Sequence, residues 1–94
     1  MAVTVHIPAA LRAEAGNQGR LEVAARGDLT LAQVLDDIGA KWPRLEHRIR
    51  DERGELRRYV NIYVGGEECR RLNGMSTPVS DRAEILVVPS VAGG

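Results

Sequence analysis

The sequence has little of what builds a disulfide scaffold, a metal centre or a strongly charged binding surface. It contains one cysteine, Cys69, and two histidines, His6 and His47, so we expect neither an internal disulfide nor a bound metal. Lysine plus arginine and aspartate plus glutamate both number 13, which gives a formal net charge of zero. This balance provides no broad positive field that would attract nucleic acid or an anionic membrane.

Long apolar runs and a phosphate-binding loop are also missing. No apolar stretch approaches the roughly 18 residues of a membrane span, and residues 1–5 lack the features of a secretory leader, so we expect a cytoplasmic protein. Gly65 and Gly66 are not accompanied by the lysine and hydroxyl residue of a phosphate-binding loop. We therefore expect a protein that binds no cofactor and is not itself an enzyme.

Four segments have the residue patterns of strands. Residues 3–7 and 21–25 alternate apolar and polar side chains, which is typical of strands with one buried face. Residues 59–64 are rich in β-branched and aromatic residues. Residues 84–88 are almost wholly apolar, which predicts a strand buried on both faces, and Pro89 ends it.

One helix is predicted after the second strand. Thr30 and Gln33 have the spacing at which a hydroxyl and an amide cap each other's backbone N–H groups at a helix start. The helix is expected to end at Gly39 or at the Trp42-Pro43 pair. Its apolar residues recur at helical spacing and form one stripe that can cover a sheet: Leu31, Val34, Leu35 and Ile38.

The segment 41–58 is predicted to be a solvated connection. It carries seven basic and four acidic residues, and only an irregular turn is expected around residues 45–49. Its clustered arginines could dock on an acidic partner, but the interspersed carboxylates favour a self-paired, solvated face. These arginines are Arg48, Arg50, Arg53, Arg57 and Arg58.

The order strand, strand, helix, strand, strand predicts an α+β protein with a β-grasp, ubiquitin-like fold. A helical crossover allows the last strand to lie parallel to the first, in the middle of a mixed sheet of four to five strands. The helix then packs across one face of this sheet. With a length of 94 residues, we expect one domain over residues 1–89 and a flexible tail over residues 90–94.

The tail is the candidate functional site. It reaches roughly 16 Å when extended, and Gly93 and Gly94 lack the Cβ that would prevent passage through a narrow channel. The Gly94 carboxylate is a poor electrophile, so its chemistry requires activation, most simply as an acyl adenylate made from ATP by a separate enzyme. We expect Gly94 to be the reacting residue and Val91, Ala92, Gly93 and Gly94 to bind the partner.

A second candidate surface lies on the sheet. Val60, Ile62 and Leu86 could form an apolar patch on the face away from the helix, or they could belong to the core. Cys69 is interpreted as a buried small hydrophobe, because no histidine or second cysteine stands near it. His6 and His47 have no carboxylate or nucleophile at a meaningful spacing and are interpreted as structural or solvated.

Three segments carry a resemblance to a known family. They are residues 3–8 with Leu11 and Arg12, residues 58–64, and residues 85–94, of which the last is the most specific. The chain resembles the MoaD/ThiS family of ubiquitin-like sulfur carriers over nearly its whole length, and its cysteine-biosynthesis branch in actinobacteria most of all. The resemblance implies that an E1-like enzyme adenylates Gly94 and that the product becomes a thiocarboxylate.

The same resemblance implies further partners. In the cysteine branch, the thiocarboxylate attacks an activated serine held by a PLP-dependent synthase, and a zinc metalloprotease releases cysteine from the carrier. Two other functions stay open for this tail: a ubiquitin-like modifier that forms isopeptide bonds, and the small subunit of molybdopterin synthase. A carrier that serves another sulfur-containing metabolite would have the same sequence features.

Overall fold

The computed structural model describes residues 2–25, 27 and 29–89. In this part of the chain five β-strands form one sheet, in the order β2-β1-β7-β4-β5, and two short strands, β3 and β6, form a second sheet. The elements are β1 (Ala2–His6), the 3₁₀ helix η1 (Ala9–Ala15), β2 (Arg20–Ala24), β3 (Leu29–Thr30), α1 (Leu31–Lys41), α2 (Pro43–Ile49), β4 (Val60–Val64), β5 (Glu67–Glu68), the 3₁₀ helices η2 (Cys69–Arg71) and η3 (Gly74–Ser76), β6 (Pro78–Val79) and β7 (Glu84–Pro89).

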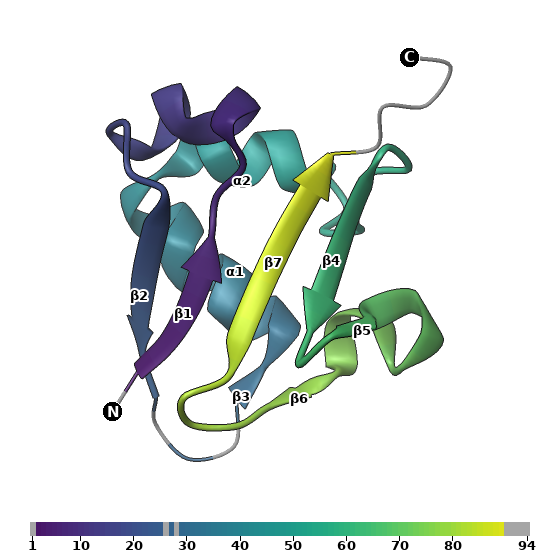
Figure 1. The fold of residues 1–94 in the computed structure, drawn as a ribbon. Coiled ribbons are helices and arrows are strands. Elements are labelled where there is room, and N and C mark those ends of the chain that lie inside the picture. Colours follow the sequence, from purple (N-terminus) through teal and green to yellow (C-terminus); the bar gives the residue numbers. More distant parts are fainter. Residues whose placement is uncertain (1, 26, 28, 90–94) are drawn as a thin grey trace.

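The last strand occupies the centre of the sheet. β7 runs parallel to β1 on one side and antiparallel to β4 on the other. The hairpin partner β2 lies on the far side of β1, and both helices cover one face of the sheet (Figure 1). This mixed sheet and its helical crossover confirm the predicted β-grasp fold.

The core lies between the sheet and the helices. Alternate residues of β1, β2, β4 and β7 point toward the helices, and the apolar stripe of α1 is buried as predicted. The side chains with at most 1% exposure include residues from both layers: Val3, Val5, Ile7, Leu31, Val34, Leu35, Leu45, Ile49, Ile62 and Ile85.

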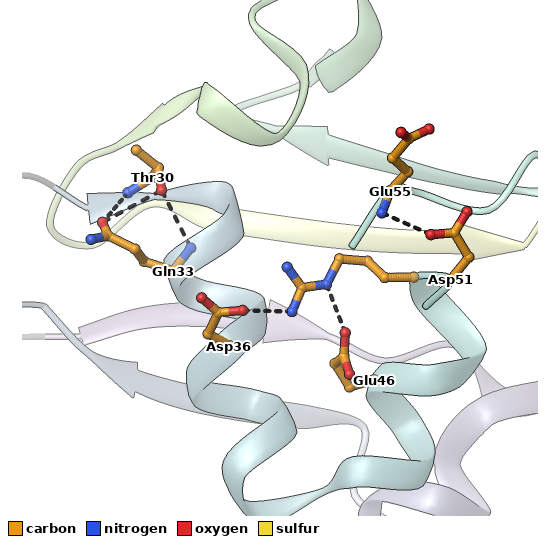
Figure 2. A network of polar contacts seen from close by, with 7 residues as sticks. Thr30, Gln33, Asp36, Glu46, Asp51 and Glu55 are labelled. Carbon is orange, nitrogen blue, oxygen red and sulfur yellow. Dashed lines mark hydrogen bonds and ion pairs between the residues drawn. The ribbon is translucent and has the colours of Figure 1, made fainter. Parts of the chain in front are cut away.

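The start of α1 is fixed by its first turn, as the sequence predicts. The Thr30 hydroxyl accepts a hydrogen bond from the Gln33 N–H at 3.3 Å, and the Gln33 side-chain oxygen accepts one from the Thr30 N–H at 2.9 Å (Figure 2). The helix ends at Lys41 because the proline at position 43 disfavours a helical conformation at Trp42.

The interpretation of residues 41–58 as a solvated connection is wrong in its first half. Residues 43–49 form α2, and both Leu45 and Ile49 are fully buried. Their i, i+4 spacing places both side chains on one face of a helix. The many charged residues around them obscure this pattern in the sequence. The next residue, Arg50, is 7% exposed and its guanidinium donates to Asp36 and Glu46 at 2.7 Å each, which ties α2 to α1 (Figure 2).

The predicted burial of both faces of the last strand is also wrong. Ile85 and Val87 point into the core, whereas Leu86 and Val88 are 43% and 36% exposed on the opposite, outer face. Both helices lie on one side of the sheet, so β7 is covered on that side only. No helix in the described part of the chain combines the length and apolar character that a membrane span requires.

Candidate functional site

The described part of the chain ends on the central strand of the sheet. Pro89, the last described residue, lies opposite Val60 in the pairing of β4 with β7. The end of β7 is therefore held by its pairing with β4, whereas the pairing with β1 ends at Leu86. The tail residues that the sequence marks as reacting or partner-binding lie outside the described part of the chain: Val91, Ala92, Gly93 and Gly94.

The three sheet residues predicted for a partner surface separate into two groups. Val60 and Ile62 are 3% and 0% exposed and belong to the core, so for these two the patch interpretation is wrong. Leu86 lies on the outer face and is exposed. The reason is the strand period of two, because residues 60 and 62 of β4 share the face that the helices cover.

The outer face next to the chain end carries an apolar stripe, which we call the outer stripe and define as Tyr63, Leu86 and Val88. Tyr63 lies directly opposite Leu86, and Asn61 lies opposite Val88. Leu86 and Val88 are exposed and Tyr63 is half-buried, and adjacent apolar side chains on an uncovered sheet face are typical of an interaction surface. The sequence argument missed Tyr63 and Val88, although the same period of two predicts that they face away from Ile62 and Val87.

Polar contacts flank the outer stripe on both sides. Toward β1, His6 Nε2 lies 2.7 Å from Glu84 Oε1, a carboxylate partner that the sequence spacing around His6 does not indicate. The parallel pairing of β1 with β7 brings these two residues together across the long sequence separation. Toward β5, the Arg70 guanidinium donates to Asn61 Oδ1 at 2.9 Å and to the Arg57 carbonyl at 3.0 Å. An apolar centre with a polar rim is the usual composition of a protein interface.

Three arginines of residues 41–58 make side-chain contacts within the chain: Arg48, Arg50 and Arg57. In addition to Arg50, Arg48 pairs with Glu14 at 3.5 Å, and the Arg57 Nε donates to the His47 carbonyl at 2.7 Å. Self-pairing within the segment is confirmed for the Arg50–Glu46 pair, whereas the carboxylate partner of Arg48 belongs to η1. These contacts hold α2 against its neighbours.

Two titratable side chains, Asp51 and Cys69, have pKa values shifted from their ordinary values. Hydrogen bonds from the backbone N–H of Glu55, and then of Arg53, lower the pKa of Asp51 in the turn that follows α2. Burial raises the pKa of the Cys69 thiol. Cys69 has 0% exposure, which confirms its interpretation as a buried small hydrophobe. Within the described residues, no three histidine, cysteine, aspartate or glutamate side chains gather as a metal ion would require.

Comparison with known proteins agrees with this geometry. The ThiS family profile matches residues 5–94. The sulfur carrier protein CysO of Mycobacterium tuberculosis is 41% identical over 96 residues, with all of both chains aligned. The chain therefore belongs to the ThiS/MoaD family of sulfur carriers, which confirms the resemblance found in the sequence.

Solved structures share the fold over nearly the full length. The crystal structure of the Amycolatopsis orientalis BexX/CysO complex gives a TM-score of 0.85 at 34% identity, covering 99% of this chain and 100% of that chain. SAMP1 of Haloferax volcanii, a small archaeal modifier protein, gives a TM-score of 0.82 at 26% identity, with 100% of both chains covered. The β-grasp domain is thus common to carriers and modifiers.

Proposed function

We propose that this chain carries sulfur as a thiocarboxylate on Gly94. The observation that carries the proposal is the family match, which extends through residue 94 and so includes the terminal glycines. The position of Pro89 at the end of the central strand supports it, because the folded domain of residues 1–89 then presents the tail of residues 90–94 from a fixed point. The chain acts as a co-substrate and not as an enzyme.

The chemistry proceeds in two steps on the terminal carboxylate. An E1-like enzyme transfers AMP from ATP to the Gly94 carboxylate, and pyrophosphate leaves. A sulfide sulfur then attacks the acyl carbon, the bond from carbon to the phosphate oxygen breaks, and AMP leaves. The product is a thiocarboxylate, a better nucleophile than the original carboxylate. The partner binds ATP, and the carrier needs no cofactor of its own.

The outer stripe is part of the same proposal. A tail of five residues makes few contacts by itself, so a partner enzyme gains affinity by binding the folded domain beside the tail. Leu86 and Val88 supply exposed apolar area next to the chain end, and Val91, Ala92 and Gly93 follow into the partner's channel. The domain provides recognition and the tail provides the reacting group.

Cysteine biosynthesis is the pathway that the similarities favour. The sequence resembles the cysteine-biosynthesis branch most of all, and the relative with 41% identity is the sulfur carrier protein CysO. The BexX/CysO complex supports a carrier of this kind binding a partner protein. For this chain we propose a PLP-dependent synthase as sulfur acceptor and a zinc metalloprotease for release, in the cytoplasm. Another sulfur-containing metabolite is the alternative product.

A ubiquitin-like modifier is the second candidate function, because SAMP1 shares the complete fold. A modifier would form isopeptide bonds with lysines of other proteins, which are detected as adducts of higher mass in a cell extract. A carrier forms no such adducts. The small subunit of molybdopterin synthase would instead co-purify with a large subunit in a stable one-to-one complex.

The experiment that tests the proposal changes the terminal glycine only. Deletion of Gly94, or Gly94→Trp, is expected to abolish sulfur transfer in a system reconstituted with the activating and accepting enzymes. Unfolding midpoints of both variants are expected to equal that of the unchanged chain, because Gly94 has no side chain that could contribute to the core. Full sulfur transfer by both variants would contradict carrier and modifier functions alike.

A further inference from the structure

The free edge of β2 is a surface that the proposed function does not use. β2 is the first strand in the sheet order, and within the described residues it pairs with β1 only. Such an edge presents backbone donors and acceptors to any strand that can lie beside it. A groove of about 550 Å³ runs along this edge between β2 and the end of α1.

The hydrogen-bond pattern between β1 and β2 shows which backbone groups of β2 face the unpaired edge of the sheet. The Thr4 N–H bonds to the Ala83 carbonyl, toward β7, so Thr4 does not bond to Glu22, its partner in β2. At the other end of the pair, the Ile7 N–H donates to the Gly19 carbonyl. Both contacts indicate that the odd-numbered residues of β1 bond to β2 and the even-numbered residues do not. In an antiparallel pair, bonded and non-bonded positions alternate. The backbone groups of Arg20 and Glu22 therefore point away from β1.

The side chains on this edge are self-complementary in charge. Arg20 and Glu22 are both exposed on the outer face, whereas Leu21 between them is 7% exposed and points toward the helices. When two copies of β2 pair antiparallel about a two-fold axis at Leu21, Arg20 of each copy lies opposite Glu22 of the other. Both pairs occupy hydrogen-bonded positions, so about four backbone hydrogen bonds form along with two ion pairs.

Other groups on the groove wall are compatible with this arrangement. The wall contributed by α1 carries one carboxylate, Asp37, and one ammonium group, Lys41, and so adds no net charge of one sign. A register centred on Glu22 would place that carboxylate directly opposite its own copy, which is unfavourable. The charge pattern thus favours the register centred on Leu21.

We propose that two copies of this chain associate through their β2 edges, antiparallel and centred on Leu21, to form one continuous sheet. β1 separates β2 from β7, so the outer stripe and the end of β7 at Pro89 stay accessible in the dimer. The contact is short, and the association is therefore weak and dependent on concentration. At high local concentration, the dimer would present two tails to a partner enzyme.

Charge reversal tests the proposal by sedimentation velocity from about 10 μM to about 1 mM. The unchanged chain is expected to form a reversible dimer. Arg20→Glu and Glu22→Arg should each weaken dimerisation by about tenfold or more, because like charges then lie opposite each other. The double variant Arg20→Glu with Glu22→Arg restores both ion pairs and should recover dimerisation. Circular dichroism of each variant verifies that it is folded.

Matched controls and a structural measurement complete the test. Arg58→Glu and Glu67→Arg change exposed residues away from β2 by the same charge and should leave dimerisation unchanged. In a mixed sample of labelled and unlabelled chains, a filtered NOE should connect the Leu21 Hα atoms of the two copies. A monomer at every concentration, a double variant that does not recover, or an NOE from Leu21 to Val23 of the other copy would overturn the proposal.

Discussion

Val60 lies directly opposite Pro89 where β4 pairs with β7. Val60 is a core residue with 3% exposure, so the last described residue of the chain is held beside the hydrophobic core. Pro89 is thereby fixed in the sheet, and it follows the exposed residues Leu86 and Val88 on the same strand. The relationship links the folding of the sheet to the proposed presentation of Gly94.

Leu86→Asp is expected to weaken binding to the activating enzyme by about tenfold, because it places a charge in the centre of the outer stripe. The unfolding midpoint should change little, since Leu86 is already 43% exposed. Isothermal titration calorimetry with the purified E1-like enzyme measures the effect.

Leu72→Asp is the matched control for this substitution. Leu72 is also an exposed leucine, at 40%, but it follows η2 and is not part of the outer stripe. Its replacement should leave the dissociation constant within about twofold of the original value. Equal losses from both substitutions would show that the outer stripe has no special role.

Arg50→Ala should destabilise the fold by about 2–3 kcal/mol, because it removes a buried guanidinium and leaves Glu46 without its partner. Asp36→Asn should cost less than about 1 kcal/mol, since the Asp36 side chain is 66% exposed. Urea unfolding of the three proteins measures both values. If Arg50→Ala costs no more than Asp36→Asn, the link between α1 and α2 contributes little.

Asp51→Asn should lower the unfolding midpoint at neutral pH and not in strong acid. The native pKa of Asp51 is lowered from its ordinary value of 3.8, so its ionised form stabilises the fold above that pH. The contribution disappears as the pH falls through the native pKa. Thermal unfolding of both proteins between about pH 7 and about pH 2 measures the difference, and a difference independent of pH would contradict this role.

Cys69→Ala should leave formation of the thiocarboxylate intact. The thiol is fully buried and its pKa is raised, so it is neither accessible nor ionised enough to accept sulfur or an acyl group. A loss of about 1 kcal/mol in stability is expected from the missing sulfur atom. Loss of carrier activity in a folded Cys69→Ala variant would instead place Cys69 on the path of the sulfur.

Local patterns predicted the parts of the fold that depend on short-range signals. The Thr30–Gln33 cap and the stripe on α1 follow from spacing alone, and the central parallel strand follows from the order of elements. α2 was missed because only two apolar residues, Leu45 and Ile49, mark its buried face among many charges. Short helices of this kind depend on packing, which a local pattern does not contain.

The candidate site was predicted in part for a similar reason. An apolar run does not tell which face of a strand is covered, so Val60 and Leu86 could not be separated by composition. The structure separates them because both helices pack on one side of the sheet. The His6–Glu84 contact depends on the register of two strands at opposite ends of the sequence, which no local pattern encodes.

The most direct test of the central proposal is intact-protein mass spectrometry after incubation with ATP, a sulfide source and the E1-like enzyme of the same organism. The account predicts a mass gain that corresponds to exchange of one oxygen for one sulfur, localised to Gly94 by fragmentation. The Gly94 deletion should show no gain. An unchanged mass with enzymes proven active on their own carriers would contradict the sulfur-carrier account and favour a modifier or a binding subunit.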